Sequence, residues 1–224
     1  MGVFWFAITN DWPVLLPIVV CSIVCLAVTI ERLWFYSINR VSSADYIHHL
    51  QKELERGPGA AREAAKRQRG VMGDLTAEGL DIVERHPERF DTMFDVATSL
   101  AMRELDRNIA VIGTIATISP YLGLFGTVVR ILLTFGELAQ AEAGGTVSSV
   151  MFGIGSALIA TAFGLGVAIV AVALNNYFRR RVEQFAGDFE MLKLVLMGIA
   201  NDLATVDERP AFSRRAAADP RAGR

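Results

Sequence analysis

The stretch Pro120-Tyr121-Leu122-Gly123-Leu124-Phe125-Gly126-Thr127-Val128-Val129-Arg130 decides the fold, because it lies inside an apolar run from Ile109 to Val129. A run of this length is long enough to span a bilayer. Lipid offers no water to satisfy backbone polar groups, so the run is predicted to be helical despite its proline and glycines.

One face of this predicted helix is small and polar. It carries Gly113, Thr117, Pro120, Gly123, Thr127, Arg130 and Thr134. Such a face on a membrane helix contacts other helices or a wet cavity rather than lipid. Because an arginine is costly to hold at membrane depth, Arg130 is expected to need a partner or access to water.

Two further runs have the length and polarity of membrane spans. The chain of 224 residues is 52% hydrophobic, with a mean hydropathy of +0.37, which is too apolar for an ordinary soluble domain. No charged residue occurs from Trp12 to Ile30, and the following Glu31 to Tyr36 resembles an aromatic interface belt with an arginine anchor. No basic region precedes this run and no small-residue cleavage site follows it, so a span is expected rather than a signal peptide. The third run extends from Thr146 to Phe178 and is followed by Arg179-Arg180-Arg181.

The sequence therefore predicts an all-α integral membrane protein with three transmembrane helices and long cytoplasmic helical extensions. Lys and Arg, apart from Arg130, lie between Glu31 and Asn108 or after Phe178, which places the N-terminus outside and the C-terminus in the cytoplasm. The expected segments are a periplasmic N-terminus (1–11), a first transmembrane helix (12–36), a cytoplasmic helical loop (37–108), a second transmembrane helix (109–136), a periplasmic loop (137–146), a third transmembrane helix (147–178), a cytoplasmic helix (179–208) and a disordered tail (209–224).

Within the cytoplasmic loop, charge-laced segments rich in helix formers predict helices at Ala44–Arg56, Ala60–Arg69 and Asp91–Asn108. Gly57-Pro58-Gly59 is expected to break the chain between two of them. No stop signal precedes the second span, so a single long helix from about Met93 is expected to enter the membrane.

The sequence contains no enzyme motif. A P-loop, a zinc-spaced His/Cys cluster and a Ser-His-acid set are all lacking, so neither catalysis nor a cofactor or metal is expected. The near-neutral charge gives no indication of nucleic-acid binding. Cys21 and Cys25, one turn apart in the first span, are interpreted as small buried hydrophobes.

The hydroxyl groups of the spans allow two interpretations. A membrane Ser or Thr most often bonds a carbonyl of its own helix. Several of them on the small-residue faces of adjacent spans favour a lined cavity instead, and the third span carries Ser149, Gly153, Ser156 and Ala160 on one such face.

Two segments resemble the ExbB/TolQ/MotA family, the stator subunits of ion-driven motors in bacterial inner membranes. They are Ile118-Ser119-Pro120-Tyr121-Leu122-Gly123-Leu124-Phe125-Gly126-Thr127 and Ala157-Leu158-Ile159-Ala160-Thr161-Ala162-Phe163-Gly164-Leu165, the latter continuing to Phe178. Glu31-Arg32-Leu33 is a weaker match. Three spans with one large cytoplasmic loop fit the ExbB and TolQ branches.

The resemblance implies a homopentameric ring around two copies of a single-span partner of the ExbD/TolR type. Thr127 and Thr161 would line the pore beside an essential aspartate of that partner, and Ser156, Pro120 and Thr134 would also line the ion pathway. Proton passage would drive mechanical work on the envelope, through a TonB/TolA-like or a motility effector. Membrane lipids are the other expected partners.

Two residues depart from the family pattern. ExbB and TolQ have a glutamate where this sequence has Ser156, and they usually have a small or apolar residue where it has Arg130. Arg130 is expected either to reach out of the membrane toward Glu137, two turns away on the same face, or to line the pore or pair with the aspartate of the partner. These departures keep an alternative open, a non-conducting paralogue that scaffolds a motor or envelope complex.

Overall fold

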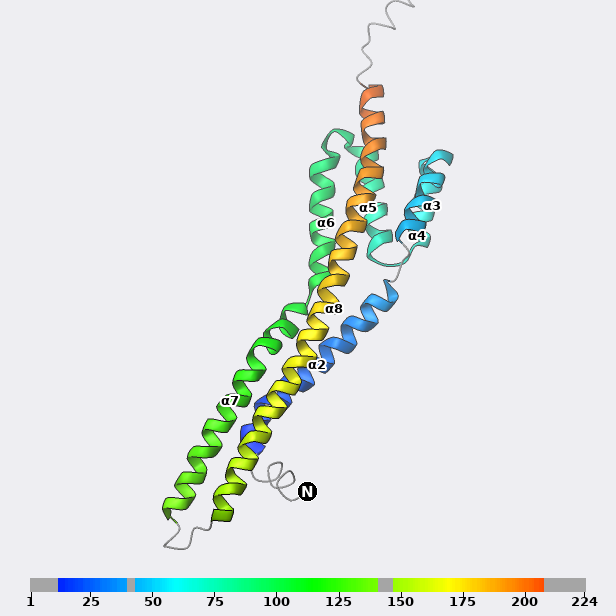
Figure 1. Ribbon diagram of the computed structural model, residues 1–224. Helices are drawn as coiled ribbons and strands as arrows, with labels where there is room; N and C mark the ends of the chain where they lie inside the picture. The colour runs from blue at the N-terminus through cyan, green and yellow to red at the C-terminus, as the bar shows by residue number, and fades with distance from the viewer. Residues whose placement is uncertain (1–11, 40–42, 141–146, 208–224) are drawn as a thin grey trace, which may run out of the picture. The chain divides into compact units, whose positions relative to one another are not determined.

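The structure, a computed structural model, describes residues 12–39, 43–140 and 147–207, which form α-helices and one short 3₁₀ helix and contain no strand (Figure 1). The helices are α2 (Trp12–Ile38), α3 (Ser43–Arg56), α4 (Pro58–Arg67), α5 (Val71–Arg85), η1 (Pro87–Arg89), α6 (Phe90–Asp106), α7 (Ile109–Gln140) and α8 (Val147–Asp207). The expected N-terminal segment 1–11, residues 141–146 of the expected loop 137–146 and the tail 209–224 lie outside the described residues, whereas residues 137–140 of that loop belong to α7. The prediction of an all-α chain is confirmed for the described part.

The chain divides into two compact units. Among the described residues, the first unit contains those from 12 to 35 and from 106 to 181, and the second contains those from 36 to 105 and from 182 to 207. Three helices are long and apolar enough to cross a membrane, over Leu15–Ile38, Ile109–Ala139 and Val150–Asn201. Helix α8 contributes residues to both units without a break after Arg179-Arg180-Arg181, so the expected segments 147–178 and 179–208 belong to one helix of 61 residues.

In the first unit, α7 runs beside the N-terminal part of α8 (Figure 1). Helices α2 and α7 both continue through an internal proline, Pro17 and Pro120. Proline removes one helical hydrogen bond, but a membrane helix tolerates this where neighbouring helices or polar groups satisfy the freed carbonyl. The helical path through Pro120 agrees with the sequence interpretation.

The expectation that one helix carries the chain from Met93 into the second span is wrong. Helix α6 ends at Asp106 and α7 begins at Ile109, because Asn108 adopts a left-handed backbone conformation with φ of 63°. Asparagine tolerates this conformation better than most residues. The Asn108 side chain donates hydrogen bonds to both carboxylate oxygens of Glu31, at 3.1 and 3.4 Å, which ties the start of α7 to α2.

Replacing Asn108 by alanine should destabilise the protein, because alanine lacks the short polar side chain that lets asparagine adopt the left-handed region, which costs other L residues about 1–2 kcal/mol. Asn108→Gly is the matched control, since it also loses the bonds to Glu31 but accepts the conformation. Thermal unfolding of both variants is the measurement. Equal melting temperatures for the two would show that the side-chain bonds, and not the backbone, give Asn108 its effect.

The second unit packs α5 and α6 against the C-terminal part of α8 (Figure 1). Phe94, Leu192 and Leu196 are fully buried there. Lys193 of α8 forms ion pairs with Asp91 (2.6 Å) and Asp95 (2.7 Å) of α6. Helix α5 was not among the helices singled out from the sequence.

Candidate functional site

The polar face of α7 meets α8 along a contact that we call the α7–α8 seam, lined by Gly123, Arg130, Ser156, Thr161 and Gly164. The two backbones touch at its centre. A Cβ added to Gly164 would lie 2.6 Å from the Ser119 carbonyl oxygen and 2.8 Å from Gly123 Cα. Only residues without a side chain allow helices this close, which is the usual role of small residues between membrane helices.

Thr161 bridges the two helices at this close approach. Its hydroxyl donates a hydrogen bond of 3.1 Å to the Gly123 carbonyl of α7, and the residue is half-buried. A carbonyl in the middle of a helix already accepts one bond, so its second lone pair becomes available to a neighbour only when the backbones are close. The close approach at Gly123 and Gly164 therefore brings the Gly123 carbonyl within reach of the Thr161 hydroxyl.

Thr127 is arranged differently. Its hydroxyl donates to the Leu124 carbonyl in the preceding turn of its own helix, at 2.6 Å. Thr134 does the same toward the Arg130 carbonyl at 2.9 Å, and its side chain packs against Gly153 of α8. Backbone bonding of this kind is the common state of a membrane threonine. Of the three threonines predicted to line the ion pathway, only Thr161 donates a hydrogen bond to another helix in the described structure.

Arg130 is buried in the seam with only 5% of its surface exposed. Its Nε donates to Ser156 Oγ of α8 at 3.1 Å, and its Nη1 donates to Glu137 Oε1 at 3.2 Å. Ser156 in turn donates to the Gly153 carbonyl at 3.0 Å. Ser156 and Arg130, the two residues expected to depart from the pattern that the sequence resembles, are therefore bonded to each other.

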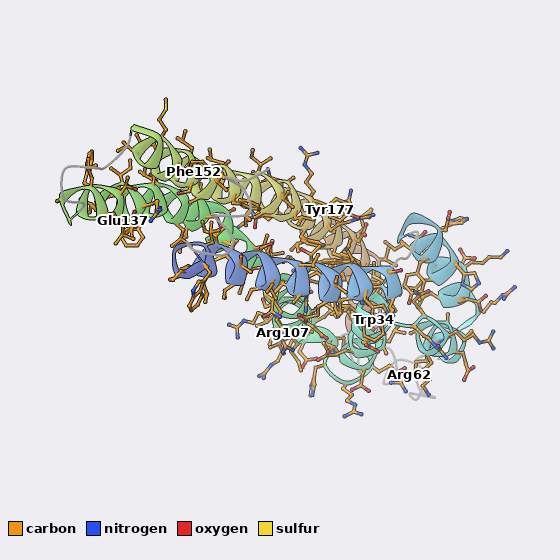
Figure 2. The ribbon with its side chains drawn as sticks, turned by 90° about the horizontal axis from the view of Figure 1, so that it is seen from below. Trp34, Arg62, Arg107, Glu137, Phe152 and Tyr177 are labelled. Atoms are coloured by element: carbon orange, nitrogen blue, oxygen red, sulfur yellow. The ribbon has the colours of Figure 1, made fainter. Side chains whose placement is uncertain are left out.

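Glu137 lies on the last turns of α7, near the N-terminal turns of α8 that carry Phe152 (Figure 2). Its side chain is 65% exposed. The Arg130 guanidinium thus joins a buried hydroxyl to an exposed carboxylate, the contact expected from a side chain that reaches out of the apolar region. Pro120 is half-buried inside α7. That Arg130 or Pro120 contacts an ion stays a prediction.

Two polar residues of the seam were not among the predicted site residues. Ser119 is fully buried, and its hydroxyl has no hydrogen-bond partner in the described part of the chain. The same holds for the Asn175 side-chain oxygen, which lies near Gly113 of α7. A serine directly before a proline, and an asparagine inside an uncharged run, are the sequence signals that could have drawn attention to them.

Comparison with known proteins shows which family this chain belongs to. A family model described as the MotA/TolQ/ExbB proton channel family matches residues 67–191, more than half of the chain. The matched region includes all of α7 and the membrane part of α8. It therefore contains every residue that has been placed in the seam.

Individual relatives agree with the family match. An ExbB-like biopolymer transport protein of Synechocystis is 29% identical over 176 residues, 77% of this chain and 84% of the relative. The Tol-Pal system protein TolQ of Pseudomonas aeruginosa is 37% identical over 124 residues, and the biopolymer transport protein ExbB of Aquifex aeolicus is 40% identical over 90 residues. These two matches cover 55% and 40% of this chain, and only 49% and 60% of the respective relatives.

The match to more than half of the chain, the three apolar helices and the close-packed seam lead to one conclusion: this multi-pass membrane protein belongs to the MotA/TolQ/ExbB proton channel family.

Proposed function

We propose that this chain is the ring subunit of an inner-membrane motor that couples proton flow to mechanical work on the cell envelope. The observation that carries the proposal is the half-buried Thr161 hydroxyl, which bridges α8 to α7 in an otherwise apolar stretch of membrane helix. Family membership and the names of the ExbB and TolQ relatives support the same function. The N-terminus would be periplasmic and the C-terminus cytoplasmic, as the distribution of basic residues indicates.

A second chain has to supply the group that carries the proton. No acidic residue occurs in the uncharged runs 12–30, 109–129 and 147–178, so no carboxylate of this chain lies at the depth of Thr161. A carboxylate in a membrane is stable only beside polar hosts and a water path, which threonine hydroxyls provide. We therefore propose a single-span ExbD/TolR-like partner with an aspartate in its span, held in two copies inside a pentamer of this chain.

The test is proton flux in vesicles. The full chain is co-expressed with the product of any neighbouring reading frame that encodes a short single-span protein with an aspartate in its span. The complex is purified and reconstituted with a pH-sensitive dye inside. Flux driven by a membrane potential is expected from the complex, and not from the ring subunit alone or from a complex with Asp replaced by Asn in the partner's span. An assembled complex that carries neither protons nor sodium would contradict the proposal.

One observation favours the alternative, a scaffold that assembles an envelope complex without conducting. Ser156 stands in the position of the family glutamate and accepts a hydrogen bond from Arg130, so the seam contains a cation where ExbB and TolQ have an acid. A buried positive charge would oppose the passage of cations. In the conducting proposal, Glu137 offsets this charge through its ion pair with Arg130.

If Glu137 offsets the charge of Arg130, removal of Arg130 should restore a proton flux that is lost when Glu137 is replaced. Glu137→Gln should lower proton flux, because it leaves the Arg130 charge without its acid, and Arg130→Met in the same chain should restore it. Arg130→Met alone should hardly change the flux. All three variants are compared in the vesicle assay at equal protein content. A large rise in flux from Arg130→Met alone would instead place this arginine in the pore as a barrier.

A further inference from the structure

Two polar groups lie on one turn of α7, and a third lies on the next turn. Pro120 has no backbone N–H, so the carbonyl of Ala116 lacks the donor that a regular helix would supply. Ala116 is buried, and Ser119, in the same turn, is fully buried with a hydroxyl that has no partner in the described residues. One turn further along α7, the Gly123 carbonyl accepts the hydrogen bond of Thr161.

Ser119 is an exception among the hydroxyl groups of its helix. Thr114, Thr117, Thr127 and Thr134 of α7 each donate to a carbonyl three or four residues earlier. Ser119 makes no such bond, although it is less exposed to solvent than any of these threonines. A buried polar group without a partner is costly, and in lipid no bulk water relieves it. The unpaired hydroxyl therefore points to a ligand.

We propose that a water molecule binds in the seam between the Ala116 carbonyl and the Ser119 hydroxyl. Water suits the site because it donates to the carbonyl and also bonds the hydroxyl, and a buried water needs two to four polar partners. A metal cation suits it poorly, since no carboxylate occurs in the neighbouring stretches 109–129 and 147–178 to balance a charge. Insertion of water beside a proline is also a recognised way of satisfying a broken helix ladder.

The position of this water would allow it to take part in proton transfer. It lies one turn from the Thr161–Gly123 bond, on the buried face of α7. A proton released near Thr161 could therefore continue along the seam through the water and the Ser119 hydroxyl. Only this relay role rests on the proposed function, and the water site itself does not.

A double-mutant cycle in the full chain tests the site without any measurement of flux. With water bound, Ser119→Ala removes one partner of the water and should lower the melting temperature. Pro120→Ala supplies the missing N–H to Ala116 and makes the water unnecessary. In that background Ser119→Ala should leave the melting temperature unchanged or raise it. Thr29→Val is the matched control, because its buried hydroxyl already bonds the Cys25 carbonyl at 2.7 Å.

If Ser119→Ala raises the melting temperature in the wild-type background, the seam is dry and the proposal is wrong. Should Pro120→Ala fail to fold, radiolytic hydroxyl labelling of the wild type in nanodiscs decides instead. Side chains around Ser119 should be labelled despite their burial, and the labelling should be lost in Ser119→Ala but kept in Thr29→Val. Unchanged labelling in Ser119→Ala would overturn the site. A ring that carries no flux would refute the proposed function. The melting temperatures and the labelling would still test the water site, because neither measurement depends on flux.

Discussion

Gly164→Ala should lower the stability of the protein by about 1–3 kcal/mol, the range for forcing an extra methyl group into a packed interior. The new Cβ would lie 2.6 Å from the Ser119 carbonyl oxygen and 2.8 Å from Gly123 Cα. Both obstacles are backbone atoms, so no side-chain rotation relieves the contact and the two helices must separate. The bond between Thr161 and Gly123 would lengthen with them.

Gly166→Ala is the matched control for this prediction. It changes the same residue type two positions further along α8, where an added Cβ would meet nothing within 4 Å. Thermal unfolding in detergent, followed by the fluorescence of the tryptophans, measures both variants. A loss of stability shared by Gly164→Ala and Gly166→Ala would mean that glycine is needed for backbone freedom in this helix and not for the close approach.

The largest functional effect is expected from Thr161→Val, which keeps the shape of the side chain and removes its hydroxyl. The Gly123 carbonyl then loses a partner, and the proposed aspartate of the partner chain loses a polar host. The loss of a hydrogen bond to a charged or buried group costs roughly 1–3 kcal/mol, enough to shift the proton affinity of that aspartate. Proton flux in the vesicle assay should fall to background while the complex still purifies intact.

Two neighbouring variants sharpen this result. Thr161→Ser keeps the hydroxyl and should retain most of the flux. Thr127→Val should reduce the flux less than Thr161→Val, because the Thr127 hydroxyl is bonded within its own turn. Full flux from Thr161→Val would show that the bond to Gly123 is only a structural contact between α7 and α8.

The membrane helices could be located from the sequence because charge is the costly element in lipid. Uncharged runs mark them directly, and the three long apolar helices follow those runs. The junction before α7 was missed, since hydrophobic periodicity does not reveal a single residue such as Asn108 with a positive φ. The sequence predicts a span and a following helix that meet at Arg179-Arg180-Arg181, and the structure describes the two as the single helix α8.

For the candidate site, helical spacing identified the polar face but not what each residue contacts. Thr127 and Arg130 were placed on this face by their spacing, whereas Thr161 was predicted from the family resemblance. That Thr161 bonds α7 while Thr127 bonds its own turn depends on the close approach at Gly123 and Gly164, which is a property of the pair of helices. The unpaired hydroxyl of Ser119 could not be foreseen, because most membrane serines bond their own backbone.

The pairing of Arg130 with Glu137 also bears on how the second span enters the membrane during synthesis. An arginine near the middle of an inserting helix costs about 2.5–3.5 kcal/mol. Glu137 belongs to the same helix and follows Arg130 by only seven residues, so the charge can be offset before the third span has left the ribosome. Ser156, which lies on α8, becomes available only afterwards. The chain therefore contains its own counter-ion for the insertion step, and the bond across the seam forms when the hairpin closes.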